Sequence, residues 1–316
     1  MTWGLMIVAL VVATTGTLAL GLLAKWVDRK VTARIQWRVG PPWYQPALDC
    51  MKLMGKEALM PSTARGSGFL LAPLLGLAGA GLAVTMLWVM NLWTSAGFVG
   101  DAIVVVYLFT LPSLATIFGA AASGSPHASV GAAREMKLLM SYELPLAIAL
   151  LVAVVHTGNS FRITQIVAAQ QADGAVALSI SGALALIVTV FCVQAKLGLV
   201  PFDQAEAETE LMAGVYTEYS GPPLAIVFVT RALLLAALPI LVITLFLGGV
   251  PATPPGLGLA VLKFVILLVV ITLLRNTNPR VRIDQSMRFF WYMLTPVALL
   301  ALALALVGQS LEVPWL

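Results

Sequence analysis

The stretch PLAIVFVTRALLLAALPILVITLFLG, residues 223–248, contains a single charged side chain, Arg231, and decides the fold. A helix of about 20 apolar residues crosses the ~30 Å hydrocarbon core of a bilayer. Outside a closed barrel, only a helix satisfies its own backbone hydrogen bonds in lipid. Soluble domains carry about 25% charged residues, whereas this chain of 316 residues is 10% charged and 60% hydrophobic. We therefore predict an all-α, polytopic membrane protein.

Apolar runs along the chain predict eight transmembrane helices within one integral-membrane domain, residues 1–316. A shorter amphipathic helix is expected after Pro46, where Leu48, Met51 and Met54 form an apolar stripe that suits the membrane interface. No internal repeat is evident, which argues against the inverted-repeat architecture of many transporters. The predicted spans are residues 3–24, 69–93, 101–122, 140–157, 176–198, 223–248, 257–274 and 290–309.

The basic residues predict how the chain is oriented in the inner (cytoplasmic) membrane of a cell. Residues 1–24 carry no Lys or Arg ahead of their apolar run, so they do not resemble a cleavable signal. Loops 25–68, 123–139 and 275–289 are rich in Lys and Arg. The loops that alternate with them contain a single basic residue, Arg162. The positive-inside rule places the basic loops in the cytoplasm and both termini outside. These loops also explain the net charge of +4, so no nucleic-acid partner is expected.

The segment PFDQAEAETELMAGVYTEYSG, residues 201–221, concentrates acidic residues at the cytoplasmic membrane surface and contains no basic residue. Crowding and partial burial of like charges raise carboxylate pKa values. If the segment is helical, residues 203, 206 and 210 share one face and titrate as a coupled group. We therefore interpret the cluster as a proton-transfer site, with a solvated acidic loop as the alternative. Its members are Asp203, Glu206, Glu208, Glu210 and Glu218.

Four more charged residues lie in or beside predicted spans, where insertion of a charge costs about 2.5–3.5 kcal/mol. Glu143 is expected at the cytoplasmic mouth of the fourth span, with a snorkelling interfacial role as the alternative. Lys196 and Arg231 flank the acidic segment, where each is positioned to neutralise one carboxylate. Lys263 stands alone in an apolar run and needs a buried partner or water. All four join the proton-transfer candidates.

Two basic loops are candidates for docking a cytoplasmic partner, although positive-inside retention also explains the last one. Asp284 is expected to be ion-paired among the arginines around it. The docking candidates are Arg29, Arg34, Arg38, Gly40, Pro41, Asp49 and Lys52 in the first loop, and Arg280, Arg282 and Asp284 in the last.

The remaining side chains provide no catalytic or metal-binding pattern. Cys50 and Cys192 are far apart, and His127 and His156 are isolated. No metal-ligand spacing, phosphate loop or nucleophile arrangement occurs in the sequence. Any redox cofactor is therefore expected in other subunits.

Four segments, in order along the chain, resemble one family. They are DRKVTARIQWRVGPPWYQPALDCMKLMGKE (28–57), AREMKLLMSYELP (133–145), PFDQAEAETELMAGVYTEYSG (201–221) and PRVRIDQSMRFFWYMLTP (279–296). The family is the large membrane subunit of respiratory complex I that joins the peripheral arm to the membrane arm, with relatives in energy-converting nickel–iron hydrogenases.

The resemblance implies an eight-helix subunit without redox centres that anchors cytoplasmic electron-transfer subunits. It also implies a hydrated acidic path toward antiporter-like membrane subunits. Glu143 and the five carboxylates of residues 201–221 match the acidic positions of that path. Arg34, Arg38, Gly40 and Pro41 match the loop that faces the peripheral arm.

Three departures favour the hydrogenase branch over the quinone-using branch. Complex I members typically have Glu-Arg-Lys in place of residues 28–30 and Gly-Pro-Asn in place of residues 40–42. Arg231 falls near a position where quinone-using members tend to carry an acidic residue.

We therefore expect the membrane-anchor and proton-coupling subunit of an energy-converting hydrogenase. Its partners would be the hydrogenase-like large and small subunits and an iron–sulfur subunit, which together contain the nickel–iron site and the clusters. One alternative is the quinone-chamber subunit of NADH:quinone oxidoreductase, with quinone as its ligand. The others are a stand-alone secondary ion transporter and a purely structural anchor.

Overall fold

The computed structural model describes residues 3–64, 66–93, 96–206, 208–251, 253–311, 313 and 315, without the side chains of residues 3, 208 and 209. Within these ranges every regular element is a helix, as predicted. Seven helical segments are long and apolar enough to span a membrane, and α8 (Ile180–Lys196) is a shorter apolar helix. The seven are α1 (Trp3–Ile35), α3 (Gly66–Leu92), α4–α5 (Asp101–Leu108 and Leu111–Ala122), α6 (Pro126–His156), α10 (Gly221–Phe246), α11 (Pro254–Thr277) and α12–α13 (Ile283–Arg288 and Thr295–Leu311).

Short elements connect these spans. The helix α2 (Gln45–Met54) confirms the helix expected after Pro46, and α7 (Ile163–Asp173) follows α6. In the described part of the acidic segment there is one turn of helix, α9 (Glu208–Leu211), and the 3-10 turn η2 (Gly214–Tyr216). A second 3-10 turn, η1 (Val176–Leu178), precedes α8, and a π-helical stretch, η3 (Phe289–Leu294), joins α12 to α13.

Two helices extend furthest beyond the predicted spans. The helix α1 continues to Ile35 instead of ending near residue 24, and α6 begins at Pro126 instead of residue 140. As a result Glu143 lies near the middle of α6. The predicted boundaries followed hydropathy, but a helix extends through polar residues of good helix propensity as long as its backbone bonds continue.

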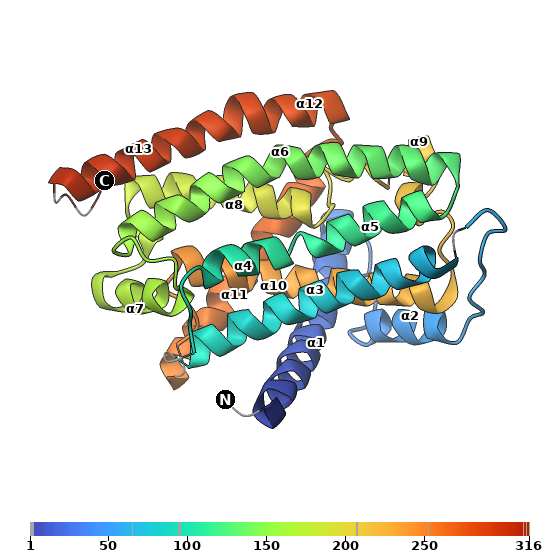
Figure 1. Ribbon diagram of the computed structural model, residues 1–316, viewed down its shortest axis with the longest axis horizontal. Helices are drawn as coiled ribbons and strands as arrows, with labels where there is room; N and C mark the ends of the chain where they lie inside the picture. The colour runs from blue at the N-terminus through green and yellow to red at the C-terminus, as the bar shows by residue number, and fades with distance from the viewer. Residues whose placement is uncertain are drawn as a thin grey trace.

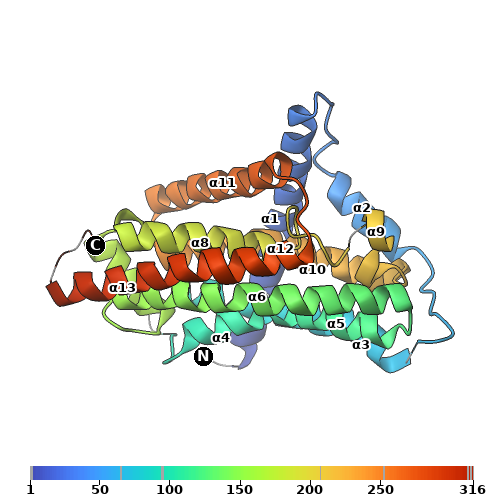
Figure 2. The same cartoon turned by 90° about the horizontal axis from the view of Figure 1, so that it is seen from above.

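The helix α10 forms the centre of the bundle. It contacts α1, α3, α7, α8 and α11. In an 18-residue apolar stretch of α10, 78% of the residues are buried. Figure 1 shows α3, α6, α8 and α13 running along the long axis of the molecule, whereas α1 crosses them steeply. Figure 2 shows α1 projecting from the bundle beside α11. In the corresponding apolar stretch of α1 only 11% of the residues are buried, so most of that helix faces outward.

The bundle has two distinct ends (Figure 1): α2 and α9 lie at one, and α7 lies at the other. Ion pairs gather at the α2–α9 end, which we call the basic end. The pairs at this end join Arg29 to Asp49, Arg134 to Glu210, Arg275 to Asp28 and Arg280 to Asp203. The loops predicted to be cytoplasmic therefore meet the acidic segment at a single end of the bundle.

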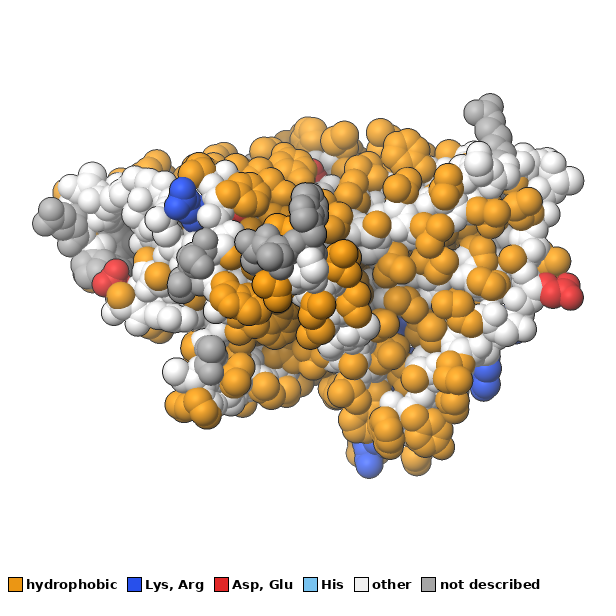
Figure 3. Space-filling model, turned by 60° about the horizontal axis from the view of Figure 1, so that its bottom comes forward, with side chains coloured by type: hydrophobic (Ala, Val, Ile, Leu, Met, Phe, Trp, Pro, Cys, Tyr) orange, Lys and Arg blue, Asp and Glu red, His pale blue; other side chains and the backbone are white. Residues whose placement is uncertain are grey.

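The outer surface is apolar. Figure 3 shows a face covered by hydrophobic side chains, with a few charged groups near its margins. On α1, Leu5 and Val12 are 56% and 63% exposed. An apolar surface of this extent is the one that lipid tails cover.

The contact between α1 and α10 depends on the missing side chain of Gly21. A Cβ atom at Gly21 would lie 2.0 Å from the backbone oxygen of Ala232, whereas a Cβ at Gly16 on the same helix would meet nothing within 4 Å. Overpacking of this kind costs about 1–3 kcal/mol. We expect Gly21→Ala to lower the melting temperature of the purified protein, measured by size-exclusion chromatography after heating. Gly16→Ala is the control, and equal melting temperatures for the two variants would contradict the close approach.

Candidate functional site

A polar cavity lies between the acidic segment and helices α5, α6, α8 and α10. Its walls combine three carboxylates and two cations with apolar and aromatic side chains. It offers about 60 Å³ to the centres of water molecules. Because one water needs at least about 10–15 Å³, the cavity has room for more than one. The charged residues in its wall are Glu135, Lys196, Asp203, Glu206 and Arg231.

Arg231 is the central cation of the cavity. Its guanidinium forms an ion pair with Glu206, and its Cζ atom lies 4.5 Å from the centroid of the Tyr216 ring. The charge of Glu135 also acts on it. A planar guanidinium offers several donors in a fixed fork and so can serve more than one acceptor. The expectation that Arg231 neutralises a carboxylate of the acidic segment is therefore met, with Glu206 as the partner.

The structure divides the predicted carboxylate cluster among separate arginines. Residues 203–206 form loop and turn, so the condition for a shared helical face of residues 203, 206 and 210 is not met. Pairing each carboxylate with its own cation avoids the like-charge repulsion that clustering would produce. The pairs are Asp203 with Arg280 at 2.9 Å, Glu206 with Arg231, and Glu210 with Arg134 at 2.6 Å.

The pKa of Glu210 shifts in the opposite direction to the rise predicted for the cluster. The hydrogen bond and the positive charge of Arg134 lower the pKa of this exposed carboxyl group. Glu218 is half-buried and does not line the cavity. The side chain of Glu208 lies outside the described residues. Of the four predicted carboxylates whose side chains the structure describes, Asp203 and Glu206 line the cavity wall.

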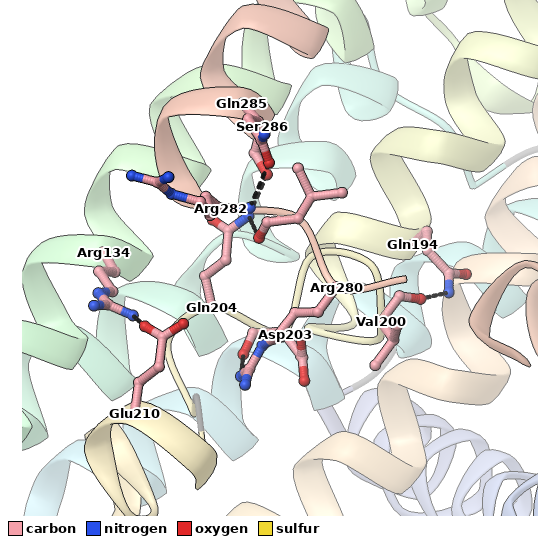
Figure 4. A network of polar contacts seen from close by, with 11 residues as sticks. Arg134, Gln194, Val200, Asp203, Gln204, Glu210, Arg280, Arg282, Gln285 and Ser286 are labelled. Atoms are coloured by element: carbon pink, nitrogen blue, oxygen red, sulfur yellow. Dashed lines mark hydrogen bonds and ion pairs between the residues drawn. The ribbon is translucent and has the colours of Figure 1, made fainter. Parts of the chain in front are cut away.

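The last basic loop holds the acidic segment in place (Figure 4). Besides its ion pair, Arg280 donates a hydrogen bond to the backbone oxygen of Asp203 at 2.8 Å. The amide of Gln204 donates to the backbone oxygen of Val281 at 3.0 Å and to the Ser286 hydroxyl. Arg280, a predicted docking residue, therefore contacts the acidic segment of its own chain.

Arg282 and Asp284 form a pair at 3.6 Å, with both side chains mostly exposed. The prediction that Asp284 is ion-paired is confirmed. The remaining predicted docking residues divide into two groups, one partly buried against the rest of the chain and one exposed.

The first group ties the loop after α1 to the protein. Arg29 pairs with Asp49 at 2.8 Å and so joins α1 to α2. Burial raises the pKa of Asp49, but hydrogen bonds from Arg29 and Gln45 outweigh burial and lower it overall. Gly40 and Pro41 fold back on α1, where the indole nitrogen of Trp26 donates to the Pro41 oxygen at 3.0 Å.

The second group is open to a partner. Arg34, Arg38 and Lys52 are all exposed. Between the two arginines the sequence analysis overlooked Trp37, whose side chain is 97% exposed. Its backbone adopts φ 58°, in the left-handed region that L-residues seldom occupy.

Glu135 is the cavity carboxylate that the sequence analysis missed. The predicted loop 123–139 placed it outside the bundle, whereas α6 in fact carries it into the cavity wall, beside the Ser113 hydroxyl. Its separation of eight residues from Glu143, about two helical turns, was the available signal.

Two tyrosines close the cavity from the side of the acidic segment. Burial, and then the nearby charge of Glu135, raise the pKa of Tyr216 above its usual range. Burial raises the pKa of Tyr219 to about 12. The hydroxyl of Tyr219 donates to the Phe69 oxygen at 3.0 Å, and the two rings stack with centroids 4.2 Å apart. Both phenols are therefore neutral at physiological pH.

Lys196 does not neutralise a carboxylate of the acidic segment. Its Nζ atom and the Oε1 atom of Glu143 are buried and have no hydrogen-bond partner in the described part of the chain. These two residues come from α8 and α6, which pack against each other.

Lys263 has a different setting from the other candidates. It donates to the backbone oxygen of Leu247, just past the end of α10. At the same end Gln170 donates to the backbone oxygens of Thr244 and Leu245 at 3.0 and 3.2 Å. These contacts satisfy the last carbonyl groups of α10. Lys263 therefore has the partner that the sequence required, but at a helix cap about 24 Å along the axis from Arg231.

Comparisons with known proteins give a consistent result. Residues 6–306 match the family described as NADH dehydrogenase. The H subunit of NADH-quinone oxidoreductase from Thermomicrobium roseum is 36% identical over 310 residues, covering 90% of this chain and 91% of the relative. The same protein from Syntrophotalea carbinolica is 36% identical over 308 residues, covering 92% and 91%. A chain of the membrane-bound sulfane sulfur reductase, an archaeal respiratory membrane complex, superposes with a TM-score of 0.86 at 28% identity, covering 95% of this chain and 99% of that one.

Arg231 is expected to keep its ion-pair partner Glu206 ionised. Replacement by Met removes the positive charge, which shifts Glu206 toward its protonated form. Infrared spectra of the Arg231→Met assembly should therefore show a new carboxyl C=O band at neutral pH, diminished again in Arg231→Met/Glu206→Gln. Arg134→Met is the matched control, because its partner Glu210 is exposed and solvated. An unchanged carboxyl band in Arg231→Met would rule out this role.

Proposed function

The chain belongs to the NADH dehydrogenase family, and from this premise we propose that it anchors a soluble electron-transfer arm to the membrane and couples the redox chemistry of that arm to ion movement. The observation that carries the proposal is the cavity, in which partly buried carboxylates lie around Arg231, beside the acidic segment at the basic end. We expect no redox activity from the chain alone. Iron–sulfur clusters and the terminal electron acceptor site would belong to partner subunits.

The contacts of the acidic segment support a coupling mechanism. Glu206 lies on a loop, whereas its partner Arg231 is fixed within α10. A displacement of the loop separates the two charges, and a carboxylate that loses its cation gains affinity for a proton. Asp203 and Gln204, which precede Glu206, are held by residues 280–286 at the basic end. An arm docked on that end would thus act on Glu206 through the three residues that precede it, 203–205.

We propose that the terminal acceptor is a proton at a nickel–iron site in a partner, as in energy-converting hydrogenases. The departures at residues 28–30 and 40–42 and the cation at Arg231 support this choice. A quinone acceptor is the second candidate, and the names of the NADH-quinone oxidoreductase relatives favour it. Metal analysis of the co-purifying subunits, together with sensitivity to quinone-site inhibitors, separates the two. Lateral partners would be antiporter-like membrane subunits.

Neutralising Glu206 should uncouple the assembly. We expect Glu206→Gln to reduce ion transport in proteoliposomes severalfold while redox activity with an artificial dye stays near the native rate, because the electron path lies in other subunits. Glu210→Gln is the matched control, since Glu210 is exposed and outside the cavity wall.

Equal loss of both activities in Glu206→Gln would indicate a structural anchor. Ion transport by this chain alone in liposomes would instead indicate an autonomous transporter.

In this proposal the exposed residues at and just after the end of α1, residues 34–39, form a docking site for the arm. We call this segment the tip. Trp37 and Val39 are 97% and 92% exposed, and Arg34 and Arg38 surround them. Tryptophan and arginine dominate the binding energy of many protein interfaces. The tip suits a partner surface with an apolar pocket and an acidic rim.

Truncation of Trp37 should weaken the binding of the electron-transfer arm. A central interface residue contributes about 2 kcal/mol or more, which corresponds to roughly 30-fold in affinity. We therefore expect Trp37→Ala to lose arm subunits during purification in moderate salt, quantified against this chain by mass spectrometry. Leu178→Ala, which truncates a side chain 82% exposed on η1, serves as the control. Full retention of the arm by Trp37→Ala would contradict the assignment.

A further inference from the structure

An apolar groove separates the N-terminal half of α1 from the end of α3. It offers about 780 Å³ to the centres of water molecules, whereas the polar cavity offers about 60 Å³. Its α1 wall includes Leu5, Ala9, Val12 and Gly16, which recur at intervals of three and four residues and so share one face of the helix. The opposite wall runs from Trp88 to residue 96. Two apolar helix faces are therefore turned toward each other across a gap.

The groove tapers. Its walls meet where the indole nitrogen of Trp88 donates to the Thr17 hydroxyl at 2.8 Å. Close by, a Cβ atom at Gly81 on α3 would lie only 3.1 Å from the Cγ2 atom of Thr14 on α1. Figure 1 shows α1 crossing the bundle steeply and ending below α3. At that end of the helix Leu5 is 56% exposed, so the groove is a wedge that opens toward the N-terminus of α1.

Water is a poor occupant of this wedge. A buried water needs two to four polar partners. None of the described residues that line the groove is charged, and the Trp88 indole already has Thr17 as its acceptor. An apolar cavity of about 150 Å³ stays dry and binds benzene, and an unfilled gap loses dispersion contacts on both walls. The groove, several times larger than such a cavity, therefore suits a hydrocarbon ligand.

The depth of the groove matches one leaflet of a bilayer. From Leu5 to Gly16 its wall extends about 16 Å along α1, roughly half of a ~30 Å hydrocarbon core. A transmembrane helix from a partner has a constant diameter of about 10–12 Å and crosses both leaflets, so it does not fill a wedge that closes in the middle of the membrane. A flexible acyl chain enters from one surface, ends near the bilayer centre and follows the taper.

We propose that this groove binds one acyl chain of a membrane phospholipid as a structural lipid, with the headgroup beside Trp93. This tryptophan directly follows α3 and is 54% exposed, and indole rings favour the depth of the headgroups. Under the predicted orientation the site lies in the outer leaflet, away from the basic end. None of the described lining residues is basic, so the groove recognises the chain and not the charge of the headgroup. The lipid fills the gap that the steep crossing of α1 leaves.

The test fills the groove with a side chain. A Cβ atom at Gly16 would meet nothing within 4 Å in the described part of the protein, so Gly16→Phe places a ring in the space of the acyl chain. Gly4→Phe is the matched control, because Gly4 lies on the same helix, has equally open surroundings and does not line the groove. Native mass spectrometry counts the phospholipids on the protein, purified with any subunits that accompany it, after extraction from vesicles of phosphatidylcholine and phosphatidylglycerol in equal amounts. We expect Gly16→Phe to retain one phospholipid fewer per copy than the native protein and Gly4→Phe to retain the native number, without preference between the two headgroups.

Photochemical labelling of unfilled grooves covers the case in which Gly16→Phe assembles poorly. Phosphatidylcholine with a diazirine in its acyl chain should label residues 5–16 and 88–96 of the native protein in vesicles. A photoreactive benzoylphenylalanine in place of Val12, which lines the groove and is 63% exposed, should capture a phospholipid.

Equal phospholipid numbers in Gly16→Phe and the native protein would overturn the proposal, as would absence of the diazirine label from the groove. Capture of a protein subunit at position 12 would show that the groove is a subunit interface. A preference for phosphatidylglycerol would show that the headgroup is recognised instead of the chain, which also contradicts the proposed site.

Discussion

The ion pair between Arg231 and Glu206 is the constraint on which the site depends. A guanidinium inside a membrane-spanning helix needs a counter-charge, because an uncompensated buried ion costs several kcal/mol. α10 supplies the cation, and the acidic segment supplies the carboxylate from a loop. Asp203 and Gln204 hold the same loop to residues 280–286. The segment therefore takes its shape from contacts with two distant parts of the chain, and not from a helix of its own.

These ion pairs change what determines the proton affinity of each carboxylate in the segment. In a cluster of carboxylates, each proton affinity would depend on repulsion by its neighbours. In the observed pairs it depends instead on the distance between each carboxylate and one arginine, which a small displacement of the loop alters. Glu210, paired with Arg134 at the surface, has a lowered pKa and stays ionised. Glu206 at the cavity is the member that loop movement affects most directly.

The two ends of α10 differ in their contacts. At the α7 end, Gln170 and Lys263 donate hydrogen bonds to the carbonyl groups of its last turn and of Leu247. At the basic end the helix begins after a loop, with Arg231 facing the cavity. Under the proposed function, a docked arm would move the loop against a fixed helix and so change the contact between Glu206 and Arg231.

The sequence alone determined the all-α membrane fold, most of the spans, the helix after Pro46 and the family, because hydropathy and helical hydrogen bonding are local properties. It also identified Arg231 and Lys196 as unusual cations. It misplaced the start of α6, since polar residues continue a helix as readily as apolar ones, and Glu135 was missed for that reason. Only the tertiary structure decided which arginine meets Asp203, Glu206 and Glu210. Those partners lie up to 77 residues away, and the packing of α6, α10 and the last loop brings them together.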